Sequence, residues 1–135
     1  EEIEVEDLPG LWREKMDELL GVVPPNDSKG ILQDVHWSQG SFGYFPSYAV
    51  GNLLAAQLFE AADEEVGPLD EQFANGEFEP LLGWLRDNVH LQGKRYLTWE
   101  LIERATGEEP SADAFLNHLK QDYLPLYREQ SAGSA

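Results

Sequence analysis

The chain has 135 residues, with 26 Asp and Glu against 9 Lys and Arg, so its formal net charge is −17 at pH 7. This charge argues against direct binding to nucleic acid or to an anionic membrane surface, because both need a basic protein face. Hydrophobic residues make up 41% of the chain, which suits one folded domain and not a disordered acidic tail.

The first predicted element is a helix between Asp7 and Gly21. Asp7 can cap it, Pro9 is tolerated in its first turn, and Gly21 can close it. Residues 22–29 follow as a loop that two prolines make stiff. The helix has apolar residues at helical spacing, namely Leu8, Leu11, Trp12, Met16, Leu19 and Leu20.

The central part of the chain begins with a segment whose structure stays open. Residues 30–35 can form a short strand or the start of a helix, because the periodicity does not decide between them. Residues 38–47 must be irregular, since they contain two glycines and a proline. The next helix runs from about Ser47 to Val66 and is apolar around its whole circumference, which predicts burial on every side. A chain of this length can barely enclose such a helix, so neighbouring segments would be missing.

Shorter helices are predicted for the remainder, at 69–74, at 78–90, at 98–105 and from Pro110 to Pro125, which would bend or end the last one. The prediction is therefore an all-α fold, an irregular helical array with one buried central helix (about 47–66) preceded by a glycine and aromatic loop. Residues 1–130 form this helical region and residues 131–135 form a flexible tail.

Several bulk features bear on where the protein works. There is no cysteine, so disulfides and thiolate metal sites are excluded. No run approaches the roughly 20 apolar residues that span a bilayer, and the acidic N-terminus does not resemble a signal peptide. We therefore expect a cytoplasmic protein. The scattered acids and the scarcity of lysine resemble adaptation to high salt.

The common catalytic motifs are absent from the sequence. None of the three histidines, His36, His90 and His118, belongs to an H-E-x-x-H pair. No helix-spaced group of His and carboxylates predicts a metal site. There is also no G-x-S-x-G elbow and no G-x-x-x-x-G-K phosphate loop. A self-contained enzyme is therefore hard to build from this chain.

His36 differs from the other histidines in its neighbours. Asp34 could accept a hydrogen bond from its ring if both side chains project the same way, as in an extended segment. Tyr44 and Tyr48 offer phenol donors near a helix start, and an imidazole and a phenol at one point suit a developing oxyanion. Composition alone favours the alternative, a satisfied aromatic core cluster of His36, Trp37, Phe42, Tyr44 and Phe45.

A family resemblance changes this balance. The sequence Gly30-Ile-Leu-Gln33-Asp34-Val-His36-Trp37 resembles the G-x-x-Q-D-x-H-W signature of the carboxypeptidase Taq family of metallocarboxypeptidases. Residues 40–48 and 51–57 are similar to the next block of that family. A weaker resemblance extends to Tyr127, so that most of the chain is covered.

The resemblance implies a mostly helical, usually dimeric enzyme that releases single residues from peptide C-termini. Its divalent metal, typically zinc, would be held by an H-E-x-x-H helix and a downstream Glu. His36 and Tyr48 would donate to the tetrahedral intermediate, and Tyr48 is preferred to Tyr44 because it begins the buried helix. Gln33, Asp34 and Tyr44 would position the substrate.

The departures from the family define what the chain lacks. The H-E-x-x-H pair, the third-ligand Glu and the family's D-x-R-x-T motif are absent. The resemblance therefore implies the C-terminal part of a homodimeric enzyme. Its partners would be the upstream catalytic region of the same chain and the C-terminus of a peptide. We expect the fragment to hold no metal and to be inactive alone.

Two other readings compete with this one. The first is an acidic helical module that binds a protein partner through the loop at 38–46. The second is a metal-independent hydrolase that uses Asp34 and His36, for which no nucleophile at a suitable spacing is present.

Overall fold

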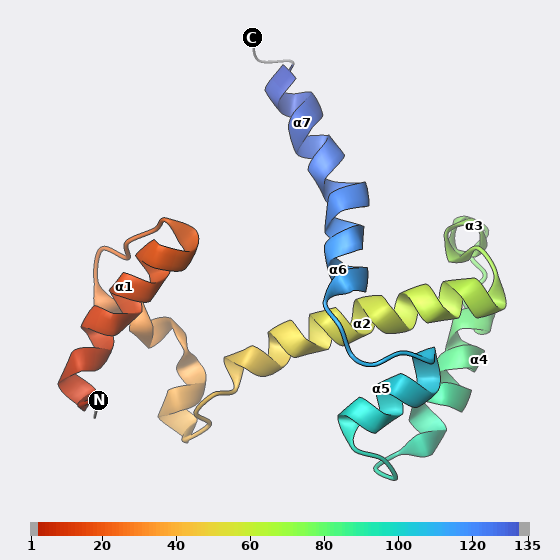
Figure 1. The fold of residues 1–135 in the computed structure, drawn as a ribbon, viewed down its shortest axis with the longest axis horizontal. Coiled ribbons are helices and arrows are strands. Elements are labelled where there is room, and N and C mark those ends of the chain that lie inside the picture. Colours follow the sequence, from red (N-terminus) through yellow and green to blue (C-terminus); the bar gives the residue numbers. More distant parts are fainter. Residues whose placement is uncertain (1–2, 133–135) are drawn as a thin grey trace. The chain divides into compact units, whose positions relative to one another are not determined.

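The structure, a computed structural model, describes residues 3–132, and only the backbone of residues 129–132. All of its regular elements are helical in the described part of the chain, which confirms the predicted all-α class (Figure 1). The chain divides into two compact units, Glu1–Ser47 and Tyr48–Ala135.

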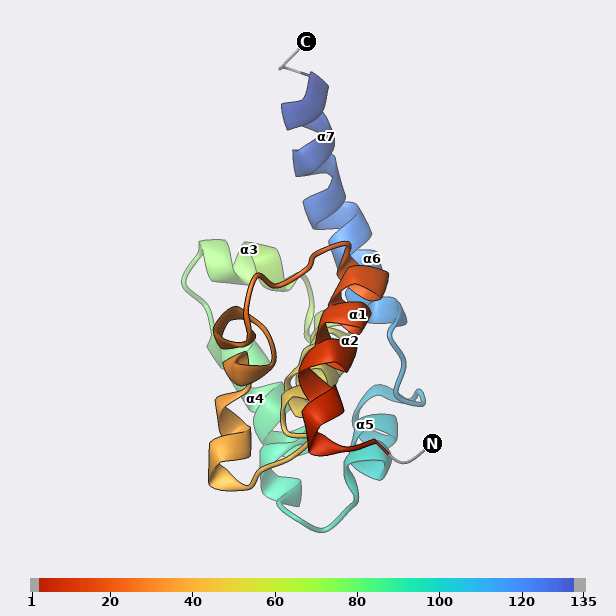
Figure 2. The same cartoon turned by 90° about the vertical axis from the view of Figure 1, so that its left-hand side faces the viewer.

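The first unit is built on α1 (Leu8–Leu20), which follows a short 3₁₀ turn at Val5–Asp7 (Figure 2). Gly21 ends α1 in the left-handed conformation, with φ of 65°, as predicted. Asp7 does not cap the helix as predicted, because its carboxylate accepts the backbone N–H of Glu4 at 3.1 Å instead.

The segment after α1 forms neither a strand nor an α-helix. It contains three 3₁₀ turns, at Asp27–Lys29, at Ile31–Gln33 and at Val35–Gln39. Asp34 lies between the last two in an extended conformation, and Gly40 ends the third turn at a φ of 74°. Such turns span only a few residues each, so they leave no periodic pattern in the sequence.

Gly30 is buried where this segment packs on α1. A methyl group at Gly30 would lie 3.2 Å from both the backbone oxygen of Asn26 and Cβ of Pro24, and 3.4 Å from Cδ1 of Trp12. We therefore expect Gly30→Ala to destabilise this unit by about 1–3 kcal/mol through overpacking. Urea denaturation followed by tryptophan fluorescence measures the change.

The matched control for this substitution is Gly10→Ala. Gly10 lies within α1, and a methyl group there would meet nothing within 4 Å. The control should therefore be neutral or stabilising by up to about 1 kcal/mol, because alanine favours a helix interior over glycine. Equal effects of the two substitutions would show that the packing around Gly30 is not tight.

Helix α2 (Phe45–Val66) begins two residues earlier than predicted and carries Pro46 in its first turn. The prediction that it is buried on every side is wrong for the described chain. Its buried side chains are Leu54, Gln57 and Ala62, whereas Tyr48 is 53% exposed. The reason is that α2 is packed by the second unit's other helices along only part of its surface.

The core of the second unit lies at the C-terminal half of α2. It joins α2 to α3 (Leu69–Ala74), α4 (Glu79–Asn88) and α5 (Thr98–Thr106), which gather at that end of the helix in Figure 1. The Nε1–H of Trp84 donates to Oε2 of Glu65 at 2.7 Å. The fully or nearly buried residues of this core are Ala62, Leu69 and Trp84. The partly buried residues packed against them are Leu58, Ala61, Val66, Phe73, Leu81, Leu85 and Ala105.

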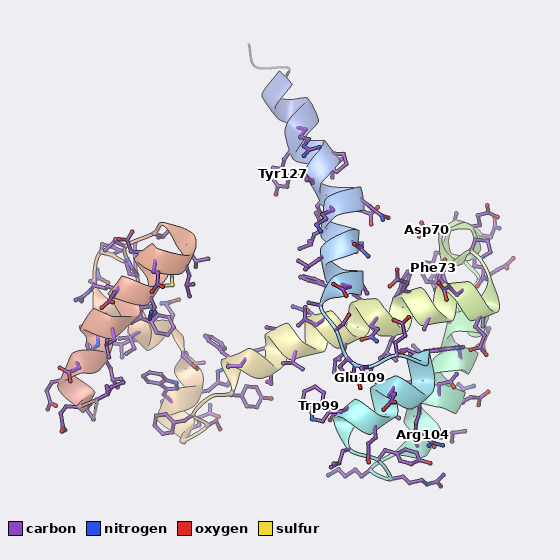
Figure 3. The ribbon with its side chains drawn as sticks, in the orientation of Figure 1. Asp70, Phe73, Trp99, Arg104, Glu109 and Tyr127 are labelled. Carbon is purple, nitrogen blue, oxygen red and sulfur yellow. The ribbon has the colours of Figure 1, made fainter. Side chains whose placement is uncertain are left out.

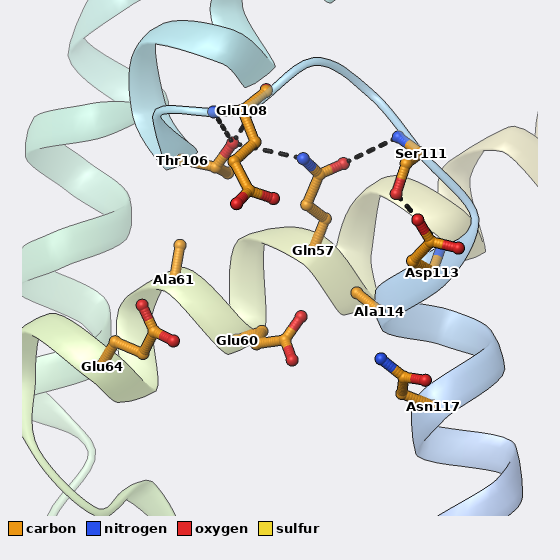
Figure 4. Close-up of a pocket in the computed structure, with 10 residues that line it drawn as sticks. All are labelled: Gln57, Glu60, Ala61, Glu64, Thr106, Glu108, Ser111, Asp113, Ala114 and Asn117. Atoms are coloured by element: carbon orange, nitrogen blue, oxygen red, sulfur yellow. Dashed lines mark hydrogen bonds between the residues drawn. The ribbon is translucent and has the colours of Figure 1, made fainter.

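A single buried amide fastens the connection between α5 and α6 (Asp113–His118) to α2. The Nε2 of Gln57 donates to the backbone oxygen of Glu109 at 3.1 Å and to Oγ1 of Thr106 at 3.3 Å. Its Oε1 accepts the backbone N–H of Ser111 at 3.2 Å (Figure 4). The amide is therefore satisfied on both sides, as a buried polar group must be.

The last helical column consists of α6, a π-helical turn at Leu119–Tyr123 and α7 (Leu124–Ala132). The helix does not end at Pro125, because the chain stays helical through this residue. The wider π turn precedes the proline, which cannot donate to the preceding turn. Ser131 and Ala132 belong to α7, and residues 133–135 of the predicted tail lie outside the described residues. No helix among the described residues is long and apolar enough to cross a membrane.

Candidate functional site

Asp34 and His36 form the centre of the candidate site. One carboxylate oxygen of Asp34, Oδ1, accepts the backbone N–H of His36 at 3.0 Å and lies 2.8 Å from its ring Nδ1. Asp34 is only 7% exposed. The predicted contact is confirmed, but its local geometry is different: Asp34 acts as the N-cap of the 3₁₀ turn that contains His36.

This double contact fixes the orientation of the imidazole. Since an ionised carboxylate only accepts hydrogen bonds, Nδ1 carries the proton that is shared with Asp34. Nε2 is the ring nitrogen that Asp34 does not hold. Because the same oxygen also holds the backbone of His36, the ring and its backbone are positioned together.

Two aromatic residues bracket the imidazole. The ring of Tyr44 stacks on it with centroids 4.6 Å apart and an interplanar angle of 22°. Phe45 approaches edge-on at 5.1 Å and 73°. Gly40 and Gly43, both at positive φ, turn the chain so that these two residues return to His36.

The alternative of a buried aromatic core does not describe this cluster. Phe42 is 73% exposed and Tyr44 is 47% exposed. Phe42 contacts Trp37, with ring centroids 5.7 Å apart. The aromatic side chains therefore form an open surface around His36, and the imidazole itself is the more enclosed group, with 19% of its side chain exposed.

The structure places the other predicted site residues in different settings. Gln33 donates from Nε2 to the backbone oxygen of Ser28 at 2.5 Å, so its amide braces the preceding turn. Tyr48 lies in the first turn of α2 and is the first residue of the second unit. Asp34, His36 and Tyr44 are thus brought together, and Phe45 joins them although the sequence marked it only as a candidate core residue.

The donor set in the described residues does not fit a catalytic metal. His36 and Asp34 bind each other through Nδ1 and Oδ1. No group of three or more His, Cys, Asp or Glu side chains that could hold a metal ion occurs among residues 3–128, whose side chains the structure describes. A structural or catalytic zinc site needs at least three such ligands.

Comparison with known proteins identifies the family. The model of the carboxypeptidase Taq (M32) metallopeptidase family matches residues 1–123. The chain is 51% identical over 126 residues to thermostable carboxypeptidase 1 of Thermus thermophilus and 46% identical to carboxypeptidase 1 of Bacillus subtilis. These matches cover 93% of this chain and 25% of each relative, so the chain spans about a quarter of their length.

Solved structures agree with the sequence comparison. The M32 carboxypeptidase of Deinococcus radiodurans R1 superimposes with a TM-score of 0.86 and 42% identity, over 93% of this chain and 25% of the other. Metallocarboxypeptidase 1 of Trypanosoma cruzi gives a TM-score of 0.82 and 39% identity, over 90% and 26% of the two chains. The chain belongs to the carboxypeptidase Taq (M32) metallopeptidase family.

Proposed function

We propose that the chain is the C-terminal part of a metallocarboxypeptidase that releases single amino acids from peptide C-termini. The observation that carries this proposal is that Oδ1 of Asp34 contacts both the ring Nδ1 and the backbone N–H of His36. It occurs within the eight residues that match the family signature. A donor fixed in this way is preorganised, which is what stabilisation of a developing charge requires.

The role of this part of the enzyme is to stabilise negative charge. In peptide hydrolysis, water adds to the carbonyl carbon and the carbonyl oxygen becomes an oxyanion. The C–N bond then breaks as a proton passes to the leaving amine. His36, through Nε2–H, and Tyr48, through its phenol, would donate to that oxyanion. Tyr44 would keep the imidazole in place by stacking, and Gln33 and Asp34 would shape the site from the adjoining turns.

The catalytic metal would be held by residues outside this chain. We propose zinc, bound by an H-E-x-x-H helix and a downstream Glu in the upstream region of the same polypeptide, where it would supply an activated water. We also propose that the complete enzyme is a cytoplasmic homodimer. This chain alone would then lack the metal site and be inactive.

The experiment that tests the function uses the complete protein that contains these residues. It is incubated with a short peptide that has a free C-terminal carboxylate and with the same peptide amidated at its C-terminus. Mass spectrometry should show stepwise loss of single residues from the free peptide only, and a chelator should stop it. Cleavage at internal bonds, or equal cleavage of both peptides, would contradict a carboxypeptidase.

Asp34→Asn tests whether the carboxylate positions His36. We expect kcat of the complete enzyme to fall about 10- to 100-fold, by analogy with the loss of a group that orients a metal-ligating histidine. KM should change little, and the ring ¹⁵N shifts of His36 should report an altered tautomer. Both readouts distinguish positioning from simple stabilisation of the fold.

The matched control is Asp122→Asn. Asp122 Oδ2 lies 2.7 Å from Nδ1 of His118 in an exposed pair on the last helical column. The control substitution therefore removes the same kind of carboxylate–histidine contact. Its kcat should stay within about twofold of the wild type, since exposed pairs contribute little. Equal losses for the two variants would contradict a special role for Asp34.

The net charge of −17 predicts a dependence on salt. Raising KCl from about 0.1 to 1 M shortens the Debye length from about 10 to 3 Å and so screens the self-repulsion of the acids. The midpoint of thermal unfolding should therefore rise over this range, most steeply at the low end, as measured by calorimetry. A midpoint that is constant or falls would contradict adaptation to high salt.

A further inference from the structure

Two polar residues are buried in the described part of the chain, Asp34 at 7% exposed and Gln57 at 5%. Oδ1 of Asp34 contacts the ring and the backbone of His36. Gln57 lies on α2, the helix that carries Tyr48, and it is the last residue of the segment 51–57 that resembles the family. The proposed function gives Gln57 no role. Since a buried polar group is costly unless it is hydrogen-bonded, the contacts of Gln57 show what it does.

The amide of Gln57 joins α2 to both ends of the connection between α5 and α6. Its Nε2 donates to Oγ1 of Thr106, the last residue of α5, and to the backbone oxygen of Glu109, which lies on the connection (Figure 3). Its Oε1 accepts the backbone N–H of Ser111. Oγ of Ser111 in turn accepts the backbone N–H of Asp113, the first residue of α6. One side chain therefore ties α2 to the end of α5 and to the start of α6.

These hydrogen bonds define the position of α2 more closely than apolar packing does. Apolar contacts such as those of Leu54, which is 9% exposed, are not directional and permit small sliding or rotation of a helix. Hydrogen bonds depend on distance and angle, so three of them on the amide of Gln57 constrain both movements. All the groups involved belong to the second unit, so the anchor is complete within this chain.

We propose that Gln57 is a positioning residue, which holds α2 at the axial position and rotation that place Tyr48 for its reaction. Tyr48 and Gln57 are nine residues apart in α2, which is about two and a half turns of helix. They therefore lie on opposite sides of α2, so the anchor does not occupy the side that carries Tyr48. Because a helix moves as a rigid element, a shift at Gln57 reaches Tyr48. The role of Tyr48 itself rests on the proposed function.

The test replaces Gln57 with methionine in the complete protein, since methionine is similar in length but makes none of the three hydrogen bonds. Misplacing a catalytic group by about 1 Å can lower a rate about a hundredfold, so we expect kcat to fall at least about tenfold. KM should stay within about twofold. In a Tyr48→Phe background, Gln57→Met should lower kcat by less than about threefold, because the donor that it positions is already lost. A substitution that only weakened the fold would have equal effects in both backgrounds.

The matched control is Gln72→Met. Gln72 lies in α3, and its Nε2 donates to the backbone oxygen of Val66, the last residue of α2, at 2.9 Å. The control therefore removes an amide-to-backbone bond from the same helix at the end far from Tyr48, and kcat should stay within about twofold. Thr106→Val removes one of the three bonds of Gln57. It serves as a milder second variant if Gln57→Met does not fold, with an expected loss of about threefold in kcat.

Amide hydrogen exchange of residues 48–56, measured by mass spectrometry, gives a readout that does not depend on catalysis. Gln57→Met should speed this exchange at least about threefold, and Gln72→Met should leave it unchanged. Unchanged exchange in Gln57→Met would overturn the proposal, and so would a loss of kcat that is the same with and without Tyr48→Phe. Faster exchange in a protein that releases no C-terminal residues would support the anchor and contradict the proposed function instead.

Discussion

Replacing His36 with alanine is expected to lower kcat of the complete peptidase about 10²- to 10³-fold, the range for loss of one preorganised oxyanion donor. The imidazole is oriented by Oδ1 of Asp34 at 2.8 Å and by the stacked ring of Tyr44. On the proposed function, removing it would delete an interaction that forms only as negative charge develops, so KM should change little. Steady-state kinetics on a peptide with a free C-terminus measures both constants.

The matched control for this substitution is His118→Ala. His118 also has a carboxylate partner, Asp122, and an aromatic neighbour, Tyr123, with ring centroids 5.3 Å apart. It resembles His36 in its contacts but lies at the end of α6, in the second unit. Its replacement should leave kcat within about twofold. If His36→Ala raised KM and left kcat unchanged, His36 would bind substrate and transition state equally; if neither constant changed, His36 would have no part in turnover.

The fold was predictable from the sequence where periodicity and helix ends agree. Helix α1 is such a case, since its apolar spacing and Gly21 define it. The stretch of 3₁₀ turns from Asp27 to Gln39 was not, because turns of three to five residues carry no repeat. The apolar surface of α2 led to a prediction of full burial together with missing neighbours, because such a surface shows that a helix needs neighbours but not which segment supplies them.

The candidate site was predictable to a similar extent. The pairing of Asp34 with His36 follows from their spacing, but the sequence suggested extended backbone where the structure has a capped 3₁₀ turn. Two glycines at positive φ bring Phe45 back to His36, and this depends on torsion angles that residue types alone do not determine. Gln33 was expected at the substrate, and its contact with the backbone of Ser28 shows that a motif residue can also brace a turn.

Tyr48→Phe, compared with Tyr44→Phe, decides which phenol donates to the oxyanion. We expect Tyr48→Phe to lower kcat about a hundredfold, because it removes a donor and leaves the ring in place. Tyr44 contacts His36 through its ring face, with an interplanar angle of 22°. Phenylalanine preserves that stacking, so Tyr44→Phe should change kcat by less than about threefold, whereas Tyr44→Leu should lower it further by releasing the imidazole.

The comparison separates the chemical role of a hydroxyl from the packing role of a ring. Each substitution to phenylalanine removes one oxygen and conserves the shape of the ring. The loss of kcat in each variant therefore measures the contribution of that tyrosine's hydroxyl alone. Steady-state kinetics should be measured for the two single variants and for the double variant. The double variant should have a kcat close to that of Tyr48→Phe. Wild-type turnover in Tyr48→Phe with a hundredfold loss in Tyr44→Phe would transfer the donor role to Tyr44, whose ring already lies on His36.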